Sequence, residues 1–255
     1  MNLVAGFADI SPAQLLLVAG VALFASVVGG LAGYGTGALM PLVLVPLIGA
    51  EPVVPIIAIS AVFTNLSRVT AYRRYADGRR ALIVISAAAL TTALGAYGYT
   101  RLTNAGAALV IGAMLISSVP LRRLARRRDF RIGDAGLGFG AVGYGIVVGG
   151  TSGSGVILLS LLMAAGLEGA AVIATDAMIS VATSAIKISV FGLAGALTAQ
   201  VLAFALLIGA IALPGAFFAR AFVERMPVHI HTAILDAAVI AGGVVMISAA
   251  ARQLV

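Results

Sequence analysis

Long apolar segments alternate with short polar breaks along the whole chain. Most of them approach the roughly 20 residues that a helix needs to cross a hydrocarbon core of about 30 Å. They cover residues 13–29, 53–72, 81–99, 105–121, 135–149, 170–192, 197–218 and 230–250. Two further segments, 38–50 and 156–166, are too short to span comfortably. The pattern predicts an all-α polytopic membrane protein with about 8–10 hydrophobic segments.

The composition supports this class and excludes others. Apolar residues make up 62% of the 255 residues and charged residues only 10%, whereas a soluble domain carries about 25% charged residues. Cysteine is absent, and His229 and His231 stand at i, i+2 without a carboxylate cluster, so we expect no metal site and no cofactor. Because no acid–base set converges, we expect no catalytic residues and no enzyme. The net charge of +7 does not indicate a nucleic-acid partner in such a chain.

Basic residues gather in alternate connections between the segments. They are Arg73, Arg74, Arg79, Arg80, Arg122, Arg123, Arg126, Arg127, Arg128, Arg131, Arg220 and Arg225. Arg101 and Arg252 fall on the other side. Since cytoplasmic loops carry an excess of Lys and Arg, the basic loops are predicted to be cytoplasmic and both termini periplasmic. The central basic loop is also expected to bind anionic lipid headgroups.

The sequence contains an internal repeat. The stretch from Val28 to Gly35 matches that from Val148 to Gly155, and all four glycines coincide. Further on, four residues of one long segment match four of another, and both copies carry a buried basic residue. The pairs are Thr64 with Thr183, Asn65 with Ser184, Arg68 with Lys187, and Tyr72 with Phe191.

We therefore predict a first transmembrane repeat over 1–121, a basic cytoplasmic linker over 122–132 and a second repeat over 133–255. Each repeat would hold one broken or re-entrant short helix and three full transmembrane helices. The distribution of arginines makes the two repeats inverted in the membrane, an architecture that is characteristic of secondary transporters.

The glycine clusters predict a binding site. The run from Gly33 to Gly37 is too rich in glycine for a stable helix, so a short helix should begin near Thr36 and its counterpart near Ser154. Helix N-termini have unpaired N–H groups and a partial positive charge, so two of them at the midplane would bind an anion. Close helix packing through GxxxG spacing is the alternative. The candidates in these clusters are Gly33, Gly35, Thr36, Gly37, Ser152, Gly153, Ser154 and Gly155. Gly35→Leu and Gly155→Leu are expected to fill the site.

Buried polar residues in the following long segments extend this candidate site. Arg68 and Lys187 are costly inside a membrane, so they either meet the substrate or extend to the interface. Thr64, Asn65, Thr183 and Ser184 could supply neutral hydrogen bonds. Asp176 is a candidate for ion coupling as a proton carrier, although its repeat counterpart is the apolar Ile57. Asp236 is a second intramembrane carboxylate, closer to the cytoplasmic start of its segment.

The glycine run from Gly29 to Gly37 with Pro41 after it, its second copy at Gly149 to Gly155, and the basic loop between two halves resemble the sulfite exporter TauE/SafE family. This family is also called the toluene sulfonate uptake permease family. The resemblance covers nearly the whole chain. It implies transport of sulfite, sulfonates or related sulfur oxyanions across the bacterial inner membrane. The second copy has Thr151, Ser152 and Ser160 where glycine or proline is common, which leaves the particular anion open.

These observations predict a secondary transporter that exports a small sulfur-containing anion by alternating access, with the two halves rocking around a midplane site. A transporter of a different small organic or inorganic anion, and an anion channel, are the alternatives. Besides the anion and anionic lipid, the sequence allows a homodimer.

Overall fold

The computed structural model describes residues 4–8, 10–32, 35–127, 131–215, 217–218 and 240–252. Within these residues the chain is helical without strands, and 5 helices are long and apolar enough to cross a membrane, which confirms the polytopic class. The first half holds η1 (Val4–Phe7), α1 (Pro12–Ala32), α2 (Thr36–Ile48), α3 (Val53–Tyr72), η2 (Arg73–Tyr75), α4 (Gly78–Tyr99) and α5 (Asn104–Arg127). The second half holds α6 (Asp134–Gly150), α7 (Gly155–Ala164), α8 (Ala170–Leu193), α9 (Ala199–Ala212) and a C-terminal helix, Ile240–Arg252.

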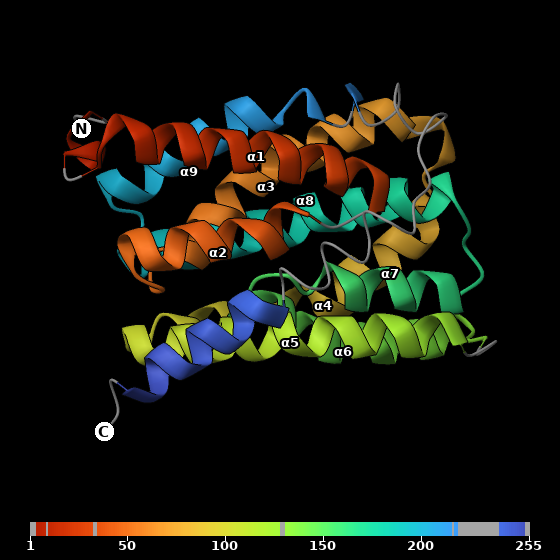
Figure 1. The fold of residues 1–255 in the computed structure, drawn as a ribbon. Coiled ribbons are helices and arrows are strands. Elements are labelled where there is room, and N and C mark those ends of the chain that lie inside the picture. Colours follow the sequence, from red (N-terminus) through yellow and green to blue (C-terminus); the bar gives the residue numbers. More distant parts are fainter. Residues whose placement is uncertain are drawn as a thin grey trace.

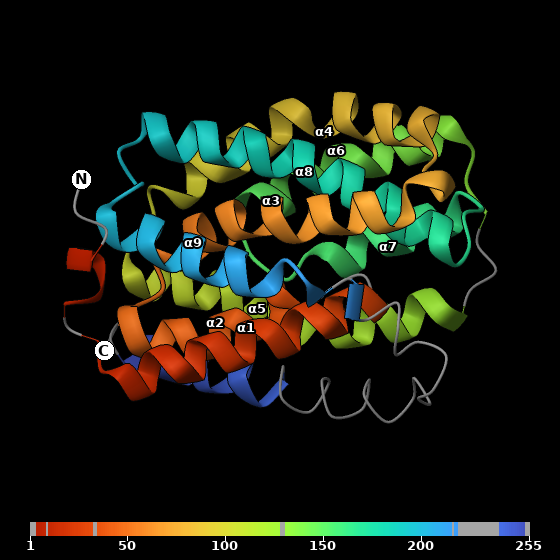
Figure 2. The same ribbon diagram turned by 90° about the horizontal axis from the view of Figure 1, so that it is seen from above.

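The helices of the two halves run in opposite directions. In Figures 1 and 2, α1, α3 and α5 run one way along the bundle, while α6, α8 and the C-terminal helix run the other way. The short helices α2 and α7 both begin near the middle of the bundle and run towards opposite ends. This arrangement is that of an inverted repeat.

The halves exchange one helix each when they pack. The fourth helix of the first half, α4, packs against α6 and α8, and its counterpart α9 packs against α1 and α3. At the centre, α3 packs against α8. Buried apolar residues form two clusters, one mainly over α1, α2, α3, α5 and α9 and the other over α4, α6, α7 and α8. We call α1, α2, α3 and α9 the first packing unit, and α4, α6, α7 and α8 the second packing unit.

Glycines bring α4 and α6 into backbone contact. A Cβ atom on Gly149 would overlap the carbonyl oxygen of Thr92, and one on Gly95 would overlap the carbonyl oxygen of Ile146. Membrane helices associate through such small residues, because lipid tails supply no hydrophobic driving force between them. Close helix packing, the alternative to a binding role for the glycine clusters, is therefore correct for Gly149.

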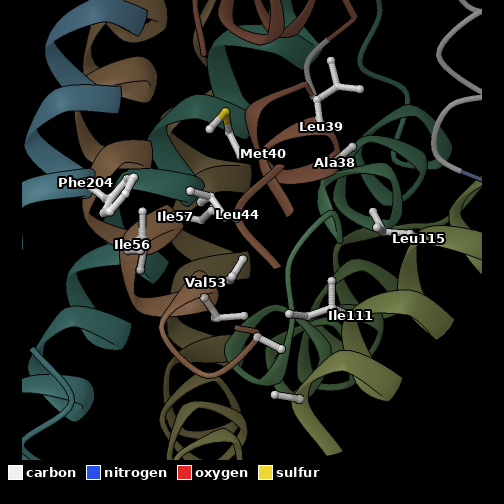
Figure 3. Packing of buried hydrophobic residues seen from close by; sticks show 14 of the residues in the cluster. Ala38, Leu39, Met40, Leu44, Val53, Ile56, Ile57, Ile111, Leu115 and Phe204 are labelled. Atoms are coloured by element: carbon white, nitrogen blue, oxygen red, sulfur yellow. The ribbon is translucent and has the colours of Figure 1, made fainter. Parts of the chain in front are cut away.

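Apolar side chains of α2 anchor the short helix in the first cluster. Figure 3 shows Met40 and Leu44 of α2 beside Ile57 of α3, with Phe204 of α9 close by. Met40, Leu44 and Phe204 are fully buried. The far end of α2 is also fixed, since Asn104 Oδ1 accepts from Ala50 N and Tyr99 Oη donates to Ala50 O at 2.6 Å.

Two helix ends differ from the sequence prediction. The fifth segment was expected to end at Leu121, but α5 continues to Arg127, because arginine favours helix and a helix extends freely beyond the apolar stretch. The segment expected to reach Phe218 ends as α9 at Ala212. Pro214 has no N–H to donate, so the hydrogen-bond ladder of the helix is interrupted there, although Leu213 keeps helical backbone angles.

Apart from Arg101, the described basic residues of the loops gather at one end of the bundle. Figures 1 and 2 place η2, the start of α4 and the start of α6 at the end opposite to the start of α1. There, Arg79 of α4 forms an ion pair with Asp134 of α6 at 2.6 Å. The turn before α4 is held by Asp77, whose N–H donates to Thr175 Oγ1 of α8 at 3.0 Å and whose carboxylate caps Arg80 N.

Candidate anion-binding site

A polar cavity lies where the two helix breaks meet α3 and α8. It encloses about 110 Å³, which holds several waters or one small oxyanion. Its lining includes Ser26, Gly35, Thr36, Gly37, Ile57, Ala61, Thr64, Asn65, Arg68, Tyr144, Thr151, Ser152, Gly153, Ser154, Gly155, Asp176, Ser180, Thr183, Ser184 and Lys187. Most of the polar side chains in this set are buried.

The two helix breaks touch each other at the cavity. Ser152 Oγ donates to the carbonyl oxygen of Gly37 at 2.5 Å, and a Cβ atom on Gly37 would lie 3.2 Å from Gly153 N. Thr151 has extended backbone with φ −152°, and Gly153 has φ +85°, a left-handed conformation that favours glycine. The second break therefore occurs where the glycine density predicted it, and α2 and α7 begin at Thr36 and Gly155 as expected.

The starts of α2 and α7 give the cavity a positive potential. The first N–H groups of a helix have no intrahelical partner, and the helix dipole concentrates partial positive charge there. Because both helices begin at the cavity wall, at Thr36 and Gly155, their dipoles add at one place. Such helix starts bind anions without a formal charge.

One face of α3 and the matching face of α8 form a large part of the remaining wall. Five pairs of repeat-related positions line the cavity with both of their members. The pairs are Ile57 with Asp176, Ala61 with Ser180, Thr64 with Thr183, Asn65 with Ser184, and Arg68 with Lys187. The five residues on α3, and likewise the five on α8, recur every three or four positions, so one face of each helix points to the cavity. The repeat is thus reproduced in space around the cavity.

Arg68 and Asp176 form an ion pair between the halves. Arg68 Nη1 of α3 lies 3.1 Å from Asp176 Oδ2 of α8, and both side chains are buried. Arg68 also donates to Asn65 Oδ1 within its own helix. An uncompensated charge is very costly away from water, so each of these charges stabilises the other. The sequence did not predict this contact, because it depends on how α3 crosses α8.

Lys187 differs from its counterpart Arg68. Its side chain is 6% exposed and lines the cavity, yet it forms no hydrogen bond or ion pair with the described residues. Extension to the membrane interface was the alternative for both basic residues, and it is wrong, since both side chains are buried at an interior cavity. A buried ammonium group beside two helix starts has the chemistry to hold an anion.

The cavity includes almost all of the predicted site residues. Thirteen of the fourteen predicted binding residues and Asp176 line it, while Gly33, His229, His231 and Asp236 lie outside the described residues. Sequence reasoning missed Tyr144, Ser180 and Ser26. Ser180 could have been found, because it stands one helical turn from both Asp176 and Ser184 on the same face.

Gly35 lines the cavity, but substitution there would not fill it. A Cβ atom on Gly35 would overlap the carbonyl oxygen of Ala25 in α1, so Gly35→Leu would push α1 and α2 apart. The expectation for this variant was therefore wrong. Gly37 is the better position, since its missing side chain points to Gly153 of the other break.

Interrupted helices are tolerated at membrane depth only beside protein or a water-filled cavity, and paired interruptions at one cavity are typical of secondary transporters. The fold and the cavity thus define a multi-pass membrane protein of the transporter class. A comparison with protein families matches residues 18–246 to the family described as sulfite exporter TauE/SafE, and the chain belongs to that family. This confirms the resemblance seen in the glycine motifs. Comparisons with curated proteins and with solved structures found no match.

Proposed function

We propose that this protein moves a small sulfur-containing oxyanion, such as sulfite or a sulfonate, across the bacterial inner membrane by alternating access. The observation that carries the proposal is Lys187, a buried cation without a partner among the described residues, at a cavity of about 110 Å³ on which α2 and α7 begin. Membership of the TauE/SafE family supports the sulfur chemistry of the substrate.

The orientation and direction of transport follow from charge. Arg73, Arg74, Arg79, Arg80 and Arg131 belong to one end of the bundle, and the excess of arginine in cytoplasmic loops assigns that end to the cytoplasm. The termini are then periplasmic. The inside-negative membrane potential contributes about 2.3 kcal/mol per charge per 100 mV towards moving an anion outwards. Export therefore requires no coupled ion. Asp176 lines the cavity and stays the candidate if transport is coupled to protons.

Flux into proteoliposomes tests the proposal. Purified protein should transport sulfite or methanesulfonate with saturable kinetics, and Lys187→Met should raise the KM at least about tenfold, while Lys187→Arg keeps part of the affinity. Arg101→Met is the matched control, because Arg101 is exposed near the end of the bundle and stacks on Tyr97. Correctly folded protein without flux for any small sulfur oxyanion would disprove the proposed substrate class. Ohmic conductance in place of saturable flux would identify a channel.

A further inference from the structure

The repeat-related pairs around the cavity differ most consequentially in their charges. Of the titratable residues that line the cavity in the described part of the chain, Arg68 and Asp176 form one ion pair, Tyr144 is a phenol, and Lys187 is a cation. Glu51 and Glu168 stand in the loops that begin α3 and α8, away from the cavity lining. The formal charge of the cavity therefore amounts to one positive charge, supplied by Lys187.

The origin of this asymmetry is a single position. Asp176 of α8 contacts Arg68 of α3, and the repeat relates these two residues to Ile57 of α3 and Lys187 of α8. The two-fold relation between the repeats therefore predicts that Ile57 lies on the side of α3 that faces Lys187, and both residues line the cavity. Ile57 is 5% exposed and lines the cavity, as its counterpart Asp176 does. Where one copy has a carboxylate to neutralise its cation, the other has an aliphatic side chain.

We propose that Ile57 is a specificity-determining residue that keeps Lys187 unneutralised, so that the site takes singly charged oxyanions in preference to doubly charged ones. The inference rests on the proposed function and specifies its substrate class. A guest with one negative charge would neutralise Lys187 and leave no net charge in the cavity. A dianion would bring a second negative charge, for which only the partial positive charges at the starts of α2 and α7 remain. An uncompensated charge in a poorly hydrated cavity is costly.

Three molecules of nearly the same tetrahedral shape separate charge from size. Dimethyl sulfone is neutral, methanesulfonate carries one negative charge and sulfate carries two. Binding of each to the purified full-length protein can be measured by calorimetry. We expect methanesulfonate to bind at least about tenfold more tightly than either of the others.

Two charge variants should move this preference in opposite directions. Ile57→Asp supplies the missing carboxylate for Lys187 and should weaken methanesulfonate binding at least about tenfold, whereas Ile57→Asn has the same shape without charge and should keep the order of the three probes. Asp176→Asn removes the negative charge beside Arg68 and should shift the preference towards sulfate. Elution profile and thermal unfolding establish that each variant is folded, and Asp176→Asn remains informative if Ile57→Asp does not fold.

The outcomes separate the two proposals. If the wild-type protein binds none of the anions, the proposed function is wrong and the charge preference falls with it. If it binds sulfate as tightly as methanesulfonate, the proposed function stands and the role of Ile57 is wrong. Equal losses in Ile57→Asp and Ile57→Asn would also overturn that role, because polarity rather than charge would then explain both.

Discussion

At the scale of single residues, the two basic side chains of the site differ in whether a carboxylate neutralises them. Arg68 is compensated by Asp176 at 3.1 Å, while Lys187 faces the cavity at 6% exposure. The repeat predicted that these two basic residues would occupy equivalent places, and they do. It could not predict their different surroundings, because Asp176 meets Arg68 only through the crossing of α3 and α8, which no local pattern encodes.

Breaking the ion pair should destabilise the protein more than removing it. Arg68→Met leaves the Asp176 carboxylate buried without its cation and should lower the free energy of unfolding by about 3–5 kcal/mol. The double variant Arg68→Met with Asp176→Leu removes both charges and should recover most of that loss. Denaturant unfolding in detergent completes the double-mutant cycle. Additive losses from the two substitutions would show that the pair is not coupled.

Lys187 is the only lysine in the sequence, which makes it a specific chemical probe. An amine-reactive acylating reagent removes the charge of the ammonium group, so labelled protein should lose anion binding. The bound anion should in turn slow the labelling, because it covers the side chain. Mass spectrometry of the peptide that contains Lys187 measures the extent of labelling. Labelling at the same rate with and without saturating methanesulfonate would contradict contact between the anion and Lys187.

At the scale of helices, glycine has two separate roles that look alike in the sequence. Gly149 lies within α6 and permits backbone contact with Thr92 of α4, whereas Gly153 lies after α6 with φ +85° and ends the helical path. The density of glycine predicted where the helices break. It could not separate packing glycines from conformational ones, since that depends on the neighbouring helix. Likewise, hydrophobicity marked the apolar part of α5 but not its helical extension to Arg127.

Substitution by alanine at two glycines of α6 should have different effects on the stability of the protein. Gly149→Ala would drive a Cβ atom into the Thr92 carbonyl oxygen and should cost about 1–3 kcal/mol of stability through overpacking. Gly143→Ala, on the same helix, has no atom within 4 Å of the new Cβ and should be neutral or slightly stabilising, because alanine favours helix. Thermal unfolding in detergent compares the two. Similar melting temperatures would mean that the α4–α6 contact is looser than described.

At the scale of the whole molecule, the packing units do not coincide with the sequence halves. The sequence predicted that the two repeats would rock against each other. In the structure, α4 of the first half is tightly packed with α6 and α8 of the second, and α9 packs with α1 and α3. Rocking of intact halves would have to break both sets of contacts. We predict instead that the two packing units move against each other across the contact between α3 and α8. Sequence alone does not reveal the exchange of α4 and α9 between the halves.

A cross-link between the halves should therefore be compatible with transport when it lies within one packing unit. Ile83 of α4 and Gly138 of α6 are suitable, because a Cβ atom on Gly138 would lie 3.7 Å from Ile83 Cγ2. The sequence has no cysteine, so oxidation of Ile83→Cys with Gly138→Cys can give only this one disulfide within the chain, and its yield is measured first by mass spectrometry. Flux in proteoliposomes should be retained in the oxidised protein. A loss of flux that reductant restores would show instead that the halves move as wholes.

The short helix α7 connects two distant parts of the molecule. It begins at the cavity wall at Gly155, and Ala164 at its other end accepts a hydrogen bond from Ile132 N, just before α6, at 2.8 Å. Its 10 residues span about 15 Å as a rigid rod. Ile132, which precedes α6, is thus joined through the length of α7 to the wall of the cavity.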